Sequence, residues 1–167
     1  MKLIVAVASD WGIGFDGDLL FDLPDDMAFF RNTTKNKIVV MGRPTLLSFP
    51  GGNPLKNRTN IVLTRDEKFK KEGCIICNST DELFEELKKY DSDDVFIIGG
   101  GKIYNELYPY CEEAYITKVN ATAKADTYLH NFDDDANWKL VFKSEKHINN
   151  GIEFTFNTYK NMRPIQK

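Results

Sequence analysis

Short apolar runs alternate with helix-like segments along this chain, and that alternation constrains its fold more than any other feature. The first run, residues 3–8, contains no polar residue, which is typical of a central strand covered on both faces. Helices are expected over 24–34, from Gly42 for a short stretch, from the capping residue Ser79 to about Tyr90, and from 101 to about Leu107. The expected strands are 3–8, 38–41, 60–64, 73–77, 95–98, 113–119, 138–144 and 152–160.

This order predicts an α/β fold in a single domain, residues 1–167. Its central sheet is expected to be mostly parallel and eight-stranded, with about four flanking helices. The last two strands close the sheet as an antiparallel edge hairpin around Asn149, Asn150 and Gly151.

Composition excludes several classes of protein and partner. With 42% hydrophobic residues and a net charge of −3, the chain is neither disordered nor collagen-like nor a coiled coil, and it lacks the basic footprint for nucleic acid. The apolar run at the N-terminus has about six residues, shorter than a signal-peptide core, and no run approaches the roughly 20 residues of a membrane span. We therefore expect a cytoplasmic monomer without nucleic-acid or membrane partners.

The three cysteines point to thiols rather than to disulfides or a metal. An odd count argues against a disulfide framework. Cys74 and Cys77 have CxxC spacing, but in a strand they face opposite sides, and no second pair or nearby histidine completes a zinc site. We expect no metal centre.

Residues 9–23 form a long segment rich in Gly and Asp. A loop of about 15 residues without structure is usually functional in a compact domain. The helix that follows carries Leu23, Met27 and Phe30 at helical spacing, and Asp26 borders this apolar stripe. Two interpretations stay open. Asp26 either only favours the helix N-terminus, or it faces an apolar pocket and pairs with a cationic or amidine-like ligand.

Glycine, hydroxyl and cationic residues follow three of the expected strands. These are the segments Gly99-Gly100-Gly101, Gly42-Arg43-Pro44-Thr45 and Thr64-Arg65. In open α/β sheets, ligands bind outside the carboxyl ends of the strands, where backbone amides at a helix N-terminus can hold a phosphate. The three segments together predict a cofactor that carries several phosphates.

These motifs resemble those of dihydrofolate reductase, and the resemblance spans essentially the whole chain. It rests on eight segments that occur in order: Ile4-Val5-Ala6, Asp10…Gly12-Ile13-Gly14, Leu23-Pro24-x-Asp26, Val40-Met41-Gly42-Arg43-x-Thr45, Pro54-Leu55…Arg58-x-Asn60-Ile61, Ile97-Ile98-Gly99-Gly100-Gly101-Lys102-Ile103-Tyr104, Thr117 and Ala125-Asp126-Thr127. The resemblance implies NADPH-dependent reduction of 7,8-dihydrofolate to 5,6,7,8-tetrahydrofolate, with hydride transfer to pterin C6 and protonation at N5. It also implies inhibition by antifolates.

The resemblance assigns a catalytic and substrate-binding set. Asp26 would pair with the 2-amino group and N3 of the pterin, and Thr117 would support it. Tyr104 and the loop residues Leu19 and Phe21 would complete the catalytic group. Arg58 would bind the glutamate α-carboxylate, a task suited to its bidentate guanidinium. The other substrate-binding residues would be Ile4, Val5, Ala6, Met27, Phe30, Phe49, Leu55 and Ile98.

The implied NADPH site is larger. Arg43 and Thr45 would meet the pyrophosphate, and Thr64, Arg65 and Lys102 would surround the 2′-phosphate. The rest of this set would be Ala6, Ile13, Gly14, Gly42, Leu63, Gly99, Gly100, Gly101, Ile103, Tyr104, Asp126 and Thr127. The resemblance also implies a cis peptide between Gly99 and Gly100.

The chain departs from the family pattern at four positions. Phe21 stands where the family usually has Trp, and Phe cannot donate the indole N–H bond, worth roughly 1 kcal/mol. Leu20 replaces a usual Pro, Pro44 replaces a basic or polar residue, and Phe49 is bulkier than the common aliphatic. Two alternatives follow: a reductase of this fold acting on another pterin or on a pyrimidine of riboflavin synthesis, or a binding or structural module without turnover.

Overall fold

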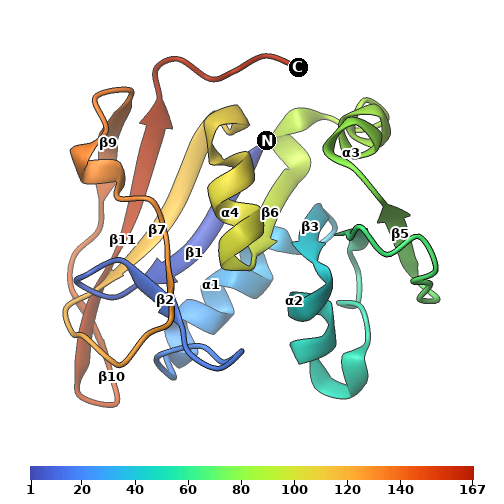
Figure 1. The fold of residues 1–167 in the computed structure, drawn as a ribbon. Coiled ribbons are helices and arrows are strands. Elements are labelled where there is room, and N and C mark those ends of the chain that lie inside the picture. Colours follow the sequence, from blue (N-terminus) through green and yellow to red (C-terminus); the bar gives the residue numbers. More distant parts are fainter.

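A nine-stranded sheet forms the centre of the molecule, in a computed structural model that describes all 167 residues (Figure 1). The strand order is β10-β11-β7-β1-β6-β3-β4-β5, and β9 also pairs with β11. The six strands from β7 to β5 are mutually parallel, whereas β11 is antiparallel to β7 and to β9 and β10. Their bounds are β1 Lys2–Val7, β3 Ile38–Gly42, β4 Thr59–Leu63, β5 Cys74–Cys77, β6 Val95–Gly99, β7 Glu113–Val119, β9 Trp138–Lys143, β10 His147–Asn149 and β11 Ile152–Asn161.

Four α-helices cover the two faces of this sheet. They are α1 (Pro24–Thr34), α2 (Arg43–Ser48), α3 (Thr80–Leu87) and α4 (Gly101–Leu107). Leu83 of α3 and Ile103 of α4 belong to the larger core, on one face, whereas Leu46 of α2 and Phe30 of α1 pack into the smaller core on the other. Figure 1 shows α4 in front of the sheet and α1 behind it. The mostly parallel α/β fold with four helices is therefore confirmed.

The antiparallel edge differs in detail from the expected hairpin. Nine strands occupy eight positions, because β9 and β10 pair with successive stretches of β11, residues 157–161 and 152–154. The break between them lies at Ser144, whose hydroxyl accepts a hydrogen bond from the Phe156 amide at 2.8 Å. The tight turn, with positive φ at Asn150 and Gly151, therefore joins β11 to β10 and not directly to β9.

The long glycine-rich segment is more ordered than expected. Within 9–23, β2 (Gly12–Gly14) pairs with β8 (Thr127–Tyr128) in a separate two-stranded sheet. A Cβ at Gly12 would lie 2.9 Å from Cβ of Ala125, so this pairing needs glycine there.

Smaller expectations are also settled by the structure. Helix α3 ends at Leu87, three residues before the expected Tyr90, and its Ser79 cap accepts from the Glu82 amide at 3.1 Å as the capping pattern predicts. The three cysteines are unpaired. None of the helices has the length and apolar character that crossing a membrane requires.

Candidate active site

Asp26 is the carboxylate at the centre of the site. It lies in the first turn of α1, half-buried, and its Oδ1 accepts a hydrogen bond from Thr117 Oγ1 at 2.6 Å. Burial raises the pKa of Asp26, and the Thr117 hydroxyl opposes that rise. No basic side chain forms an ion pair with Asp26. The carboxylate is thus placed to pair with a donor or cation from a ligand.

Tyr104 lies buried on α4 next to the same strand ends. Its hydroxyl donates to the Ile4 carbonyl at 2.8 Å, and burial together with the Asp26 charge raises its pKa. The phenol therefore keeps its proton and uses it to hold β1.

The expected apolar walls come together on the α1 side of the sheet. Ile4 and Ile98 are buried in the smaller core, and Phe30, Phe49 and Leu55 are partly buried against it. Met27 is 41% exposed at the outer edge of α1. Ala6 pairs with Thr117 in the ladder between β1 and β7, which places it beside the carboxylate's support.

Val5 departs from this set. Its side chain packs into the larger core, on the opposite face of the sheet from Asp26. Strand alternation explains the difference, because Ile4 and Ala6 take the α1 face. Only the backbone of Val5 remains available to a substrate, so its side chain does not line the pocket.

Arg58 is held rigidly at the far end of α1. Its Nε donates to Thr34 Oγ1 at 2.9 Å, its Nη1 to the Lys56 carbonyl at 2.9 Å, and its Nη2 to the Arg31 carbonyl at 3.4 Å. These bonds use three of the five guanidinium donors and leave one hydrogen on each terminal nitrogen. Burial and the Arg31 charge lower its pKa from a very high value. The arrangement suits bidentate binding of a carboxylate.

A glycine-lined corner lies at the N-terminus of α4. The Gly99–Gly100 peptide is cis, as the resemblance implies. A Cβ at Gly100 would lie 3.4 Å from Thr45 Oγ1, and one at Gly101 would overlap Thr127. No side chain caps α4, so its first backbone amides are free to meet an anion.

The cations near this corner are not equivalent. Arg65 and Lys102 are exposed and form no ion pair. Arg43, expected to meet a pyrophosphate directly, instead pairs with Asp66 at 3.0 Å and stacks 4.8 Å from the Phe69 ring. Thr64 accepts a hydrogen bond from the Asp66 amide at 3.2 Å. A ligand phosphate would therefore compete with Asp66 for Arg43.

A model of the family described as "Dihydrofolate reductase" matches residues 1–161. The dihydrofolate reductase of Staphylococcus haemolyticus is 35% identical over 98% of this chain and 96% of its own length, and that of Bacillus subtilis is 33% identical over 96% and 94%. The structure of the Enterococcus faecalis dihydrofolate reductase complexed with NADP(H) and RAB-propyl superposes with a TM-score of 0.86 at 31% identity, covering 96% of this chain and 95% of that one.

This chain belongs to the dihydrofolate reductase family. The members of this family are oxidoreductases that reduce dihydrofolate with NADPH, and this chain has their reaction, their cofactor and their substrate class.

The residues of this chain fit the dinucleotide that the family uses. The uncapped α4 N-terminus and the tight glycine corner leave room for phosphate close to the backbone, and Arg65 and Lys102 supply unpaired positive charge. Gly42 lies beside Ile103, with a Cβ there only 3.0 Å from Ile103 Cγ1, so α4 also packs closely against β3. Leu63 and Ile13 pack into the larger core, which also contains Ile103 of α4.

Asp126 fastens the segment 9–23 by hydrogen bonds. Asp126 accepts hydrogen bonds from the Asp16 amide and the Thr127 hydroxyl, both at 2.9 Å, and its own amide donates to the Gly14 carbonyl at 3.0 Å. The first two bonds lower its pKa. Asp126 and Gly14 thus tie the loop to the segment that leads into β8.

The two loop residues assigned to catalysis have different surroundings. Leu19 is 72% exposed at the tip. Phe21 is partly buried against Leu23, Val119 and Phe154. The contacts of the Phe21 ring are therefore with other apolar side chains.

Sequence reasoning missed one contact close to the carboxylate. Asn149, in β10, accepts from the Asp25 amide at 2.9 Å and donates to Asp25 Oδ2 at 3.0 Å, while Asn150 donates to the Asp22 carbonyl at 3.0 Å. One signal pointed toward it: Leu23 cannot cap α1 with its side chain, which leaves the Asp25 amide open to an acceptor from elsewhere in the chain.

Proposed function

We propose that Asp26 is the catalytic carboxylate through which this chain reduces 7,8-dihydrofolate. Its ionised form would accept hydrogen bonds from the 2-amino group and N3 of the pterin and would favour the cationic, N5-protonated ring. The observation that carries this role is the half-buried Asp26, held by Thr117 in an apolar pocket without a basic partner.

The substrate's tail would bind at Arg58. The two free N–H groups of its preset guanidinium match the α-carboxylate of a glutamate. This arrangement favours a folate over a tail-less pterin or a pyrimidine. The rings of Phe30 and Phe49, with Leu55, would contact the apolar part of the substrate between the two charged ends.

The nicotinamide coenzyme would lie on the other side of the strand ends. Thr45 and the amides of Gly100, Gly101 and Lys102 would hold its pyrophosphate, and Arg65, Lys102 and Thr64 its 2′-phosphate. When bound, the coenzyme supplies the hydride that pterin C6 accepts. An unphosphorylated ribose would leave two cations without partners, which favours NADPH over NADH.

The second hydrogen reaches N5 as a proton. Tyr104 uses its proton on the Ile4 carbonyl, and no other titratable side chain in the site is placed as a general acid. An ordered water would deliver the proton while Asp26 stabilises the resulting charge. The balance is one hydride to C6 and one proton to N5, giving tetrahydrofolate.

These residue roles are tested by following NADPH oxidation by the purified protein, with and without dihydrofolate. We expect oxidation that depends on dihydrofolate, stops with an antifolate and falls sharply in Asp26→Asn. Near-wild-type turnover in that variant would exclude the role of Asp26. A tail-less dihydropterin that matched dihydrofolate in kcat/KM would exclude the role of Arg58. We further propose that the chain acts as a monomer, since one chain supplies every residue of both subsites. We also propose that it acts in the cytoplasm.

A further inference from the structure

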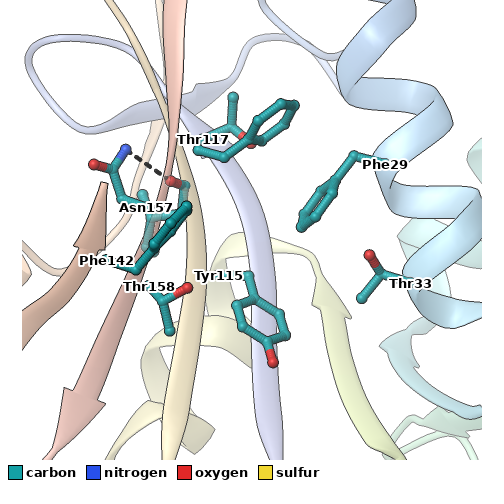
Figure 2. Close-up of a pocket in the computed structure, with 9 residues that line it drawn as sticks. Phe29, Thr33, Tyr115, Thr117, Phe142, Asn157 and Thr158 are labelled. Atoms are coloured by element: carbon teal, nitrogen blue, oxygen red, sulfur yellow. Dashed lines mark hydrogen bonds between the residues drawn. The ribbon is translucent and has the colours of Figure 1, made fainter. Parts of the chain in front are cut away.

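A second cavity, of about 270 Å³, lies behind the catalytic carboxylate. It is bounded by α1, β7 and β11 and is open on the side of β9 (Figure 2). It occupies the same face of the sheet as Asp26. However, it faces the side of α1 that carries Phe29, whereas the substrate pocket faces the side that carries Phe30.

Four of the nine residues that line the cavity are aromatic. Phe29 lies 4.7 Å from Phe156 and 6.4 Å from Tyr115, measured between ring centroids. Phe142 stands across the gap from Phe29 in Figure 2, and 56% of its surface is exposed. A flat molecule seated between Phe29 and Phe142 would cover this exposed ring and contact aromatic faces on two sides.

The polar part of the wall consists of neutral groups. Thr33 and Thr158 stand on opposite walls in Figure 2, and the Thr158 hydroxyl points into the gap. No charged side chain lines the cavity. Such walls favour an uncharged aromatic ligand with one or two hydrogen-bonding groups, since a charged ligand would find no counter-charge.

One residue of the wall holds the catalytic carboxylate, and a second lies near it on the same helix. Thr117 lines the cavity and donates its hydroxyl proton to Asp26 Oδ1. Phe29 lies on α1, one helical turn after Asp26. A molecule that presses on Phe29 or draws on the Thr117 hydroxyl therefore changes the position and hydrogen bonding of Asp26.

We propose that this cavity is a second ligand site, which takes a small, flat, uncharged aromatic molecule and lowers turnover through Thr117 and Asp26. The binding half of the proposal is independent of the proposed function, and the inhibition half rests on it. Because bound ligand contacts the support of Asp26 and not the substrate, saturating dihydrofolate does not abolish the inhibition.

Indole is a suitable probe, with indole-3-acetate as its charged counterpart. We would titrate each into the protein by isothermal calorimetry while an antifolate saturates the active site. We expect saturable binding of indole that persists while the antifolate occupies the active site, and at least fivefold weaker binding of indole-3-acetate. Displacement of indole by the antifolate, or absence of saturation, would overturn the site. Equal affinity for the two probes would overturn the ligand class.

A matched pair of variants on β9 locates the site. Phe142→Ala removes the ring at the mouth of the cavity. Val141→Ala changes the neighbouring residue, which is 52% exposed and does not line the cavity. We expect Phe142→Ala to weaken indole binding at least fivefold and Val141→Ala to leave it unchanged. Equal effects of both variants would overturn this location.

The regulatory half needs a kinetic measurement. With saturating dihydrofolate and NADPH, we expect indole to lower kcat at least twofold in the wild type and in Val141→Ala. Phe142→Ala should largely resist it. Calorimetric binding without any change in kcat would overturn the coupling to Asp26. Absence of dihydrofolate reduction altogether would count against the proposed function, and the binding arm would still decide whether the site exists.

Discussion

The hydroxyl of Thr117 donates to the carboxylate of Asp26 across 2.6 Å, although 91 residues separate them in the chain. This bond joins the middle of the sheet to the first turn of α1. It also sets the ionisation of Asp26, because burial raises the pKa of that carboxyl and the Thr117 hydroxyl holds it down.

Replacing Thr117 by Val should impair the reaction through Asp26. Without the hydroxyl, the pKa of Asp26 rises further, so its ionised form appears only at higher pH. A hydrogen bond to a charged group contributes about 1.5–3 kcal/mol, so we expect hydride transfer at neutral pH to slow roughly tenfold or more. Single-turnover rates across pH would measure both effects. Thr117→Ser keeps the donor and should stay near the wild type, and a Ser variant as slow as Val would contradict the explanation.

Asp26→Asn should stabilise the fold at neutral pH while it removes activity. The pKa of Asp26 is raised above the unfolded value of 3.8, so its ionised form costs stability in the folded protein. That cost is absent below pH 3.8 and grows as pH rises through the folded pKa. Thermal unfolding should therefore show a higher Tm for Asp26→Asn than for the wild type at pH 7, with a smaller difference below pH 3.8, where the carboxyl is protonated in both the folded and the unfolded chain. A difference that is the same at both pH values would argue against it.

Arg58→Gln should weaken the binding of substrates that carry a glutamate. Losing a bidentate charged pair costs about 1.5–3 kcal/mol, so we expect KM for dihydrofolate to rise roughly 10- to 100-fold with a smaller change in kcat. Arg58 also donates to Thr34 and to two carbonyls, so a general disturbance of α1 has to be separated from the ligand effect. A dihydropterin without the glutamate provides that control. Equal losses for both substrates would assign Arg58 a structural role only.

Local patterns predict the elements that carry this site better than its long-range pairs. Helix periodicity predicts the start of α1 at Pro24 and the position of Asp26 beside Met27 and Phe30. Residues that suit tight turns predict the turn at Gly99–Gly101. Nothing local to Arg43 predicts its pairing with Asp66, because a sequence pattern reports burial and not the partner.

The C-terminal edge shows the same limit. Residues 138–144 have the pattern of a strand. Their register against β11 depends on the break in the edge strand at Ser144, and a local pattern does not report the position of that break. Likewise, strand alternation predicts that Val5 faces away from its neighbours in β1. It does not predict which face of β1 meets α1, because that is a tertiary contact.

Arg65→Ala should weaken binding of NADPH and reduce its advantage over NADH. Arg65 is exposed and unpaired, so its removal leaves the fold intact and deletes one of the two free cations near the expected 2′-phosphate. We expect the Kd of NADPH, followed by quenching of protein fluorescence, to rise about tenfold while the Kd of NADH stays constant. Lys160→Ala removes an exposed charge on β11 and serves as the control. A parallel weakening of NADPH and NADH in the Arg65 variant would place that residue elsewhere.

Asn149→Ala should loosen the first turn of α1. The residue before this helix, Leu23, makes no side-chain cap, and Asn149 replaces that cap from β10 by accepting from the Asp25 amide and donating to its carboxylate. Loss of a helix cap costs about 1 kcal/mol, which corresponds to a fall in Tm of roughly 2–4 °C in a protein of this size.

Ile148→Ala supplies the matched control, because Ile148 is the preceding residue and 62% exposed. It should change Tm by less than half as much as Asn149→Ala. Hydrogen exchange at the amides of Asp25 and Asp26 should accelerate in the Asn149 variant alone, since only that change removes an acceptor from the turn that carries the catalytic carboxylate. Unchanged exchange there, together with an unchanged Tm, would mean that α1 holds Asp26 in place without help from β10.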